Sequence, residues 1–140
     1  MLLTKIKYEA LNAKQKESYN FQKISAVLAN YGFNTIRLSD DWQGADFIAQ
    51  HIDGEQFLKI QLKSRLTVDK KYVGKIIYIC FCENKQWYLY PHDDFLAWLK
   101  THTTFETSDS WQTHHSYSWP YLNKNLTQHL KQYALSGDDR

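Results

Sequence analysis

An Asp-Gly pair between two extended runs constrains the fold of this chain more than any other feature. Residues 45–52 and 55–63 are rich in side chains that favour strands, and Asp53-Gly54 stands between them. Both residues tolerate the positive φ of a type I′ turn, so the pattern predicts a two-residue β-hairpin. Such a turn also fixes the register, because each residue after it then has one partner before it.

The predicted register gathers three polar side chains at one end of the hairpin. Asp46 lies opposite Gln61, and Lys63 follows two residues later. Directly opposed residues share a face of the sheet, as do residues two apart on one strand. Lys59 falls on this face by the same rule. We therefore expect Asp46, Gln61 and Lys63 to converge. A carboxylate, an amide oxygen and an ammonium group in one place indicate a site for a metal ion and a phosphate.

Length and composition are typical of one globular domain. The chain has 140 residues, of which 43% are hydrophobic and 16% aromatic, and this content favours a packed core over disorder. We expect a single domain over residues 1–140, with a core at about 12–102 and a C-terminal aromatic loop and helix at 103–135. The net charge of +2 indicates no class of partner by itself.

The sequence favours a cytoplasmic protein without a membrane anchor. The N-terminus lacks the continuous apolar segment of a signal peptide, and no apolar stretch approaches membrane-spanning length. Cys80 and Cys82 lie two apart in an apolar run, too far apart on one strand to bridge comfortably, so we expect free thiols in a reducing compartment. The chain has no Gly-rich phosphate loop, which argues against a Walker-type nucleotide hydrolase.

Hydrophobic periodicity predicts a helix, several strands and further helices. The first helix carries an apolar stripe at helical spacing, and the run before Cys82 is nearly all apolar, as in a strand buried on both faces. Residues 39–44 are expected to form a polar loop, and 103–119 a lid, a partner surface or a loosely packed loop. The predicted helices cover 12–31, a segment from Pro91 and 120–135, and the predicted strands cover 33–38, 45–52, 55–63, 75–82 and 87–90.

Glu17 lies on nearly the same side of the first helix as the apolar stripe, since it precedes Ile24 by seven residues. A carboxylate on the buried side of a helix near its start needs an explanation. An interaction with the helix dipole, a lysine partner or a metal site would each supply one.

A basic stretch directly follows the predicted site. Between residues 59 and 75 the sequence places six cationic side chains against one acid, Asp69. The stretch is able to meet a phosphate backbone, although a solvated lysine-rich loop has the same composition. Tyr72 within it offers a ring for stacking on an unpaired base. The candidate nucleic-acid-binding residues are Lys59, Arg65, Lys70, Lys71, Tyr72 and Lys75.

The chain resembles the PD-(D/E)XK nuclease superfamily in the order of its predicted elements. A helix and a strand are followed by a hairpin, which carries an acid and a residue-x-lysine motif, and then by a further strand. Restriction endonucleases and Holliday-junction resolvases are among the members of this superfamily. Asp46 matches the first acid of the motif, preceded by alanine where proline is common, and Lys63 matches the lysine. Gln61 stands where an acid is usual, although some members carry glutamine. Glu17 fits the acid that many members carry on the first helix.

This resemblance implies a fold and a chemistry. The fold is a restriction endonuclease-like three-layer sandwich of the α/β class, with a mixed central sheet of about five strands flanked by helices. The chemistry is metal-dependent hydrolysis of phosphodiester bonds by a DNA endonuclease, with Mg²⁺ as cofactor and Mn²⁺ able to substitute. The metal ligands would be Asp46, Gln61, the Leu62 carbonyl and Glu17. Lys63 would orient or deprotonate the attacking water, or steady the phosphate.

Two other interpretations stay open at this point. Because Gln61 replaces a carboxylate, the chain is also compatible with a catalytically inactive nuclease-like module that binds nucleic acid or protein. The third interpretation is a partner-binding module built on the aromatic segment 103–119, without nucleic acid. If the protein cuts both strands of a duplex, a homodimer is expected, since each copy would supply one site.

Overall fold

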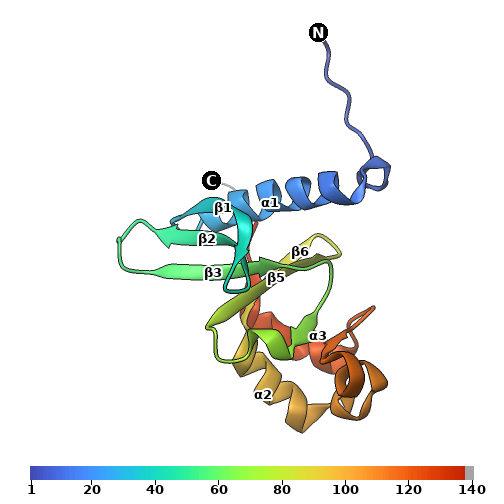
Figure 1. The fold of residues 1–140 in the computed structure, drawn as a ribbon. Coiled ribbons are helices and arrows are strands. Elements are labelled where there is room, and N and C mark those ends of the chain that lie inside the picture. Colours follow the sequence, from blue (N-terminus) through green and yellow to red (C-terminus); the bar gives the residue numbers. More distant parts are fainter. Residues whose placement is uncertain (138–140) are drawn as a thin grey trace.

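A computed structural model describes residues 1–137, apart from the side chains of Asp41 and Trp42. It contains a six-stranded sheet with the strand order β1-β2-β3-β5-β6-β8 (Figure 1). Neighbouring strands are antiparallel except β3 and β5, which are parallel. The strands of this sheet are β1 (Phe33–Trp42), β2 (Ala45–His51), β3 (Phe57–Leu62), β5 (Ile77–Glu83), β6 (Gln86–Pro91) and β8 (Ala134–Leu135).

Helices cover both faces of the sheet (Figure 1). α1 (Ala13–Ala29) lies on one face, and α2 (His92–His102) and α3 (Lys124–Leu130) lie on the other. The predicted α/β class, the mixed sheet and the three layers are therefore confirmed, and the additional strand is β8, which pairs with β6 at the edge. No helix within residues 1–137 is both long and apolar enough to cross a membrane.

A capping box begins α1, and an apolar stripe holds the helix on the sheet. Asn12 Oδ1 accepts from the Gln15 N–H at 2.8 Å, and Gln15 Oε1 accepts from the Asn12 N–H at 2.9 Å. Ile24 and Leu28 are fully buried in one cluster with Phe47 of β2. The stripe predicted from helical spacing is thus the side of α1 that packs on the sheet.

The predicted hairpin register is confirmed, but the turn differs from the prediction. Ala49 pairs with Leu58, as the count from the turn requires. Gly54 takes a positive φ of 76°, whereas Asp53 keeps an ordinary negative φ. The predicted type I′ turn is therefore wrong. The Asp53 carboxylate closes a longer loop instead, by accepting the Glu55 N–H at 2.8 Å.

The segment predicted as a polar loop at 39–44 is mostly strand. β1 continues to Trp42, with a register shift between Arg37 and Trp42. The chain then turns at Gly44, which has a φ of 91° and lies so close to Tyr72 that a Cβ there would be 3.1 Å from the ring. Pairing with β2 therefore outweighs the polar composition of this segment.

The aromatic segment 103–119 is packed into the protein, so the predicted loosely packed loop is wrong, while the lid and the partner surface stay predictions. Phe105 and Trp111 are buried in the larger core cluster. β7 (Ser116–Ser118) pairs with β4 (Thr67–Asp69) in a second, two-stranded sheet. The final helix is also shorter than predicted, since the chain leaves α3 for the short strand β8.

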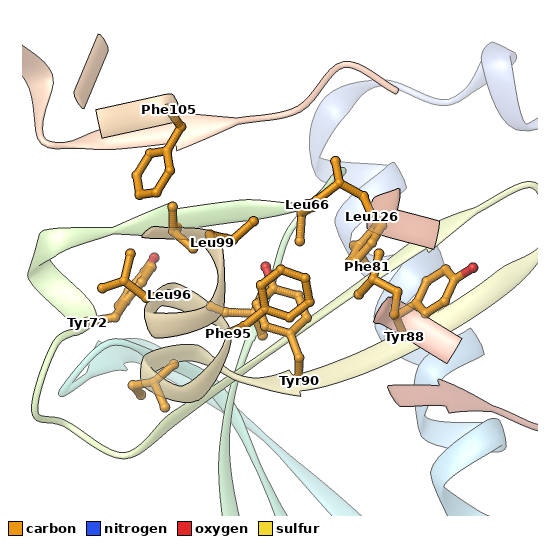
Figure 2. Close-up of a cluster of buried hydrophobic side chains, with 14 of the residues drawn as sticks. Leu66, Tyr72, Phe81, Tyr88, Tyr90, Phe95, Leu96, Leu99, Phe105 and Leu126 are labelled. Atoms are coloured by element: carbon orange, nitrogen blue, oxygen red, sulfur yellow. The ribbon is translucent and has the colours of Figure 1, made fainter. Parts of the chain in front are cut away.

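The larger core cluster lies between the sheet and α2 (Figure 2). Phe81 stacks on Tyr88 with ring centres 5.2 Å apart, and Tyr90 meets Phe95 of α2 at 4.8 Å. The opposite face of β5 contributes Cys80 to the cluster under α1. β5 is therefore buried on both faces, as its apolar sequence predicts.

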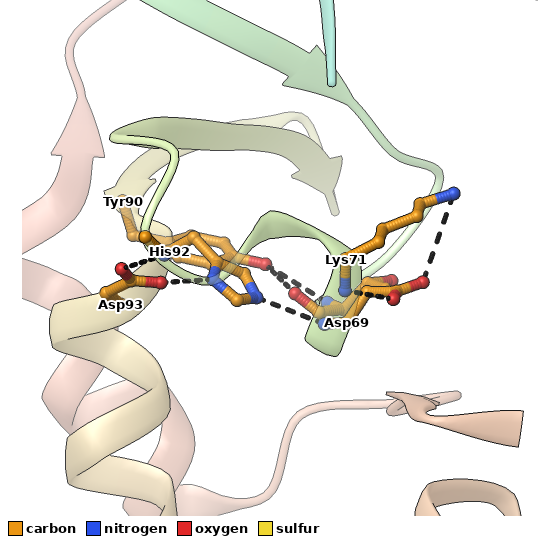
Figure 3. Close-up of polar contacts among 7 residues, drawn as sticks. Asp69, Lys71, Tyr90, His92 and Asp93 are labelled. Carbon is orange, nitrogen blue, oxygen red and sulfur yellow. Dashed lines mark hydrogen bonds and ion pairs between the residues drawn. The ribbon is translucent and has the colours of Figure 1, made fainter. Parts of the chain in front are cut away.

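Buried polar contacts fasten β4 to the start of α2 (Figure 3). The Tyr90 hydroxyl donates to the Thr67 carbonyl at 2.5 Å and accepts from the Thr67 N–H at 3.1 Å. His92 is fully buried, and its Nε2 accepts from the Asp69 N–H at 3.0 Å. Because Nε2 accepts, Nδ1 carries the proton and donates to Asp93 at 2.9 Å.

We expect His92 to make the fold sensitive to acid. Burial lowers the pKa of His92 below its ordinary value of 6.5, although the bond to Asp93 opposes this shift. The unfolded chain therefore binds the proton more readily than the folded chain. The stabilisation is complete above the unfolded pKa and is lost as the pH falls below it. Urea unfolding at about pH 7 and about pH 5 measures this loss as a fall in the free energy of unfolding.

Two variants isolate the contribution of this histidine. His92→Gln keeps a side chain that can donate and accept but does not titrate, so it should lose less stability between the two pH values than the wild type. His114→Gln changes an exposed histidine and should behave as the wild type. Equal acid losses in the wild type and in His92→Gln would contradict the prediction.

Candidate functional site

β2 and β3 separate at Asp46, and this separation creates the candidate site. The ladder between them ends at the pair Phe47 and Ile60. Hydrogen-bonded pairs alternate along an antiparallel ladder, so the Leu62 N–H would next meet the Ala45 carbonyl. It donates instead to Asp46 Oδ2 at 2.8 Å. A charged side chain thus takes the place of a backbone carbonyl.

Asp46 opens into a cavity of about 500 Å³ between α1, β1 and the separated strands. Glu17 lines the same cavity from the first half of α1, so the two carboxylates predicted as site residues share one space. Glu17 is exposed, however, so the expectation of a carboxylate on the buried side of the helix is wrong. Leu62 also lines it, and its carbonyl points to the β2 side because the N–H and C=O of a strand residue face the same neighbour. Phe21 and Phe47 form an apolar part of the wall.

Two cations of this cavity, Lys14 and Arg37, were not among the predicted site residues. Arg37 donates through Nη1 to Ser18 Oγ at 3.0 Å, and its guanidinium carbon lies 5.4 Å from the centre of the Phe21 ring. Arg37 pairs with Phe47, next in sequence to the candidate acid. Arg37 could have been identified if the pairing of β1 with β2 had been predicted. The polar composition of the segment before β2 indicated a loop instead.

Gln61 occupies the adjoining position of β3, with its amide oxygen buried. Ile60 and Leu62 pack toward α1, so strand alternation turns Gln61 to the opposite face, where it pairs with Ile79 of β5. Gln61 Oε1 accepts no hydrogen bond within the described part of the chain. A buried acceptor without a partner costs about 1–3 kcal/mol. This oxygen is therefore available to a cation or to a donor from outside the chain.

Lys63 follows β3, and its ammonium lies against an aromatic ring. Its N–H continues the parallel ladder by donating to the Cys80 carbonyl at 2.9 Å. Lys63 Nζ lies 5.4 Å from the centre of the Tyr72 ring, and Lys71 Nζ lies 5.2 Å from the same ring. Tyr72 in turn packs beneath Gly44, two residues before the candidate acid. Two ammonium groups are thus gathered near the start of β2.

Tyr72 is 1% exposed, so the prediction that its ring stacks on a base is wrong. The ring supports the neighbouring lysines instead. Lys59 is half-buried, and its Nζ donates to Gln43 Oε1 at 3.4 Å. The other predicted nucleic-acid-binding residues are exposed, namely Arg65, Lys70, Lys71 and Lys75.

The structure places the predicted site residues in two groups. Asp46, Glu17 and Leu62 line one cavity, whereas the functional atoms of Gln61 and Lys63 have other surroundings. Convergence of all these groups on one cation stays a prediction. Among residues 1–137, no three acidic, histidine or cysteine side chains are grouped closely enough to hold a metal ion by themselves.

The thiols are free, as predicted. Burial, with a smaller contribution from the charge of Asp46, raises the pKa of the Cys80 thiol. Burial also raises the pKa of Cys82. Both thiols therefore stay protonated near neutral pH, which agrees with a packing role rather than a nucleophilic one.

Comparison with known proteins finds similarity only at the level of structure. No protein-family model matches the sequence, and no curated protein matches it significantly. The Holliday junction resolvase Hjc from Archaeoglobus fulgidus, an archaeal hyperthermophile, is similar with a TM-score of 0.45 and 17% identity, over 56% of this chain and 74% of that chain. The bacterial homing endonuclease I-Ssp6803I is similar with a TM-score of 0.45 and 16% identity, over 61% of this chain and 70% of that chain. At these values, neither similarity assigns an activity or a substrate to this chain.

We expect Gln61→Met to stabilise the protein in the absence of metal. Methionine is close to glutamine in size and removes the buried oxygen, so the free energy of unfolding should rise by about 1 kcal/mol. Urea unfolding in EDTA measures the change. Gln50→Met, at a half-buried glutamine of β2, is the matched control and should change stability by less than about 0.5 kcal/mol. A loss of stability in Gln61→Met would show that the amide is needed by the fold.

Proposed function

We propose that this protein is a metal-dependent phosphodiesterase that acts on nucleic acid, as a DNA endonuclease. The observation that carries the proposal is the Asp46 carboxylate at the point where β2 and β3 separate, in a cavity shared with Glu17. Gln61, the residue before Leu62 in β3, adds a buried oxygen without a hydrogen-bond partner. The buried oxygen of Gln61 is costly unless a cation or a donor from outside the chain uses it.

The donor set suits Mg²⁺ or Mn²⁺ because all of its atoms are oxygens, which hard divalent cations prefer. The proposed ligands in the cavity are the carboxylates of Asp46 and Glu17 and the Leu62 carbonyl. The Gln61 amide oxygen is the fourth proposed ligand, and its side chain would have to turn from the opposite face of β3 to join them. The partnerless state of Gln61 Oε1 is the feature of the fold that favours a cation there. A bound cation supplies a water of lowered pKa and neutralises charge on a phosphate oxygen.

Cationic side chains take the other proposed roles. Lys63 would hold the attacking water or the phosphate, since its ammonium is a compact charge just beyond the end of β3. Arg37 and Lys14 would bind phosphate oxygens from the cavity wall. Further cations would follow the nucleic acid backbone away from the site, namely Lys59, Arg65, Lys70, Lys71 and Lys75.

A second candidate function is nucleic-acid binding without cleavage. It is favoured by two observations. No three acidic, histidine or cysteine side chains form a metal cluster in the part of the chain that the structure describes. One oxygen of Asp46 is also already engaged by the Leu62 N–H. Salt-sensitive binding through the exposed cations would suffice for this function.

A plasmid-nicking assay tests catalysis. With Mg²⁺ or Mn²⁺, the wild type should nick supercoiled DNA. Asp46→Asn should lower the rate by at least about 100-fold, because it removes a charged ligand without changing size. Lys63→Ala should also lose activity while its circular dichroism spectrum is unchanged. Asp40→Asn is the matched control, since Asp40 lines the same cavity but is not a proposed ligand, and it should keep most of the activity.

The alternative outcomes are distinct. Equal DNA binding by all variants, with no nicking by the wild type, would reject catalysis and support the second candidate. Nicking that survives Asp46→Asn would place the chemistry outside this cavity.

Gln61→Glu should strengthen the proposed metal site. A carboxylate at this position adds an anionic ligand, so the Mn²⁺ concentration that gives half-maximal thermal stabilisation should fall by roughly tenfold. Without metal, the same variant should be less stable than the wild type, because a buried charge is added. Gln50→Glu is the control and should leave the Mn²⁺ dependence unchanged. An unchanged Mn²⁺ dependence in Gln61→Glu would place residue 61 outside the metal site.

A further inference from the structure

A second cavity, of about 680 Å³, is lined in part by other residues of α1. The N-terminal segment and α1 supply two tyrosines to it, and the segment after β3 and the β5–β6 hairpin supply lysines. We call it the tyrosine–lysine pocket. The residues that matter here are Tyr8, Lys16, Tyr19, Asn20, Lys63 and Lys85.

We propose that the tyrosine–lysine pocket binds one unpaired nucleotide of a nucleic acid substrate. The phosphodiester next to this nucleotide lies at Asp46. This inference rests on the proposed function, because the proposed function is what places the reacting phosphodiester at Asp46. It adds a substrate class, namely nucleic acid with at least one unpaired nucleotide beside the reacting bond.

The two tyrosines form a partly exposed aromatic pair. Lys23 Nζ lies 5.2 Å from the centre of the Tyr19 ring, so a base would stack on a ring that also meets a cation. The rings of Tyr8 and Tyr19 meet edge to face with centres 5.2 Å apart, and they are 36% and 38% exposed. The Tyr8 hydroxyl accepts from Asn20 Nδ2 at 2.8 Å, which holds that ring in place. Exposed aromatic rings held in one orientation suit stacking on bases, because every base has a π face.

The charge of the pocket complements a phosphate chain. Lys16 and Lys85 line it against one acid, Glu9, which leaves a surplus of one positive charge. Lys63 also lines the pocket, but its ammonium lies against the Tyr72 ring. Lys16 Nζ lies 5.2 Å from the centre of the Tyr8 ring. A base stacked on that ring would therefore place its own phosphate within reach of a lysine.

The pocket and the candidate site are continuous along the chain. Leu62 lines the site cavity and Lys63 lines the tyrosine–lysine pocket, while α1 presents Glu17 to the first and Lys16 to the second. The proposal therefore requires that a nucleic acid with a phosphodiester at the first cavity place its next nucleotide at the second. A base inside a duplex has both faces covered by its neighbours, so only an unpaired base can present a face to these rings.

Fluorescence polarisation tests the inference without any need for catalysis. The probes are a labelled single-stranded oligodeoxynucleotide and an abasic strand of the same length and charge, both in EDTA. The wild type should bind the strand with bases more tightly. Tyr19→Ala should weaken that binding by roughly tenfold, the scale of one base stacked on one ring, and leave the abasic strand unchanged. Tyr19→Phe keeps the ring and should keep the affinity.

Two more variants complete the set. Lys16→Gln should lower the slope of log affinity against log salt by about 0.7, as expected for one lost phosphate contact on a single strand. Tyr121→Ala changes a tyrosine that is 73% exposed and lies outside the pocket lining, and it should match the wild type.

The outcomes separate this inference from the proposed function. Base-dependent binding that is lost in Tyr19→Ala supports the pocket even if the plasmid is never nicked. Equal affinity for the two strands, or equal loss in Tyr19→Ala and Tyr121→Ala, would overturn it, even if Asp46-dependent nicking is observed.

Discussion

The hydrogen bond from the Leu62 N–H to the Asp46 carboxylate is the interaction on which the candidate site depends. Where two strands part inside a sheet, a backbone N–H loses its partner, and a buried N–H without an acceptor is costly. The carboxylate satisfies this donor, so the strands can separate and the cavity beneath α1 can reach Asp46 and Glu17. A carboxylate has several lone pairs, so one oxygen can replace the backbone carbonyl while the group still offers acceptor capacity to a ligand.

Packing in the core holds the end of β3 in place where the two strands separate. β3 runs parallel to β5, the strand that is buried on both faces, so the end of β3 is held by the most buried part of the sheet. On the α2 face, Tyr90 and His92 fasten β4 through backbone groups of Thr67 and Asp69. The chain then places the Tyr72 ring under Gly44, where it carries the ammonium groups of two lysines. The position of the basic residues relative to Asp46 is therefore a consequence of core packing on the opposite side of the sheet.

Local patterns explain which parts of the fold could be predicted. Counting from the turn placed Ala49 opposite Leu58, because pairing in a hairpin depends on chain connectivity alone. The apolar stripe of α1 and the all-apolar run of β5 were predictable because burial follows helical or strand periodicity. The turn itself was not predictable, since the Asp53 side chain stabilises a longer loop that the Asp-Gly pair does not distinguish from a type I′ turn. Residues 39–44 were mistaken for a loop because their polar composition conceals the continuation of β1 beside β2. In residues 103–119 the polar composition conceals the pairing of β7 with β4, a strand far away in sequence.

Sequence alone determined the α/β class and the hairpin register, and it placed an acid, a glutamine and a lysine near one end of the hairpin, because each depends on spacing along the chain. The three layers were implied by the family resemblance. Tertiary structure decided which of these groups share a space. Asp46 and Glu17 line one cavity because α1 packs on β2, and Arg37 lines it too because β1 pairs with β2. Tyr72 is removed from solvent because it packs under Gly44. These contacts join residues far apart in sequence, and their energy comes from burial and pairing that no local pattern encodes.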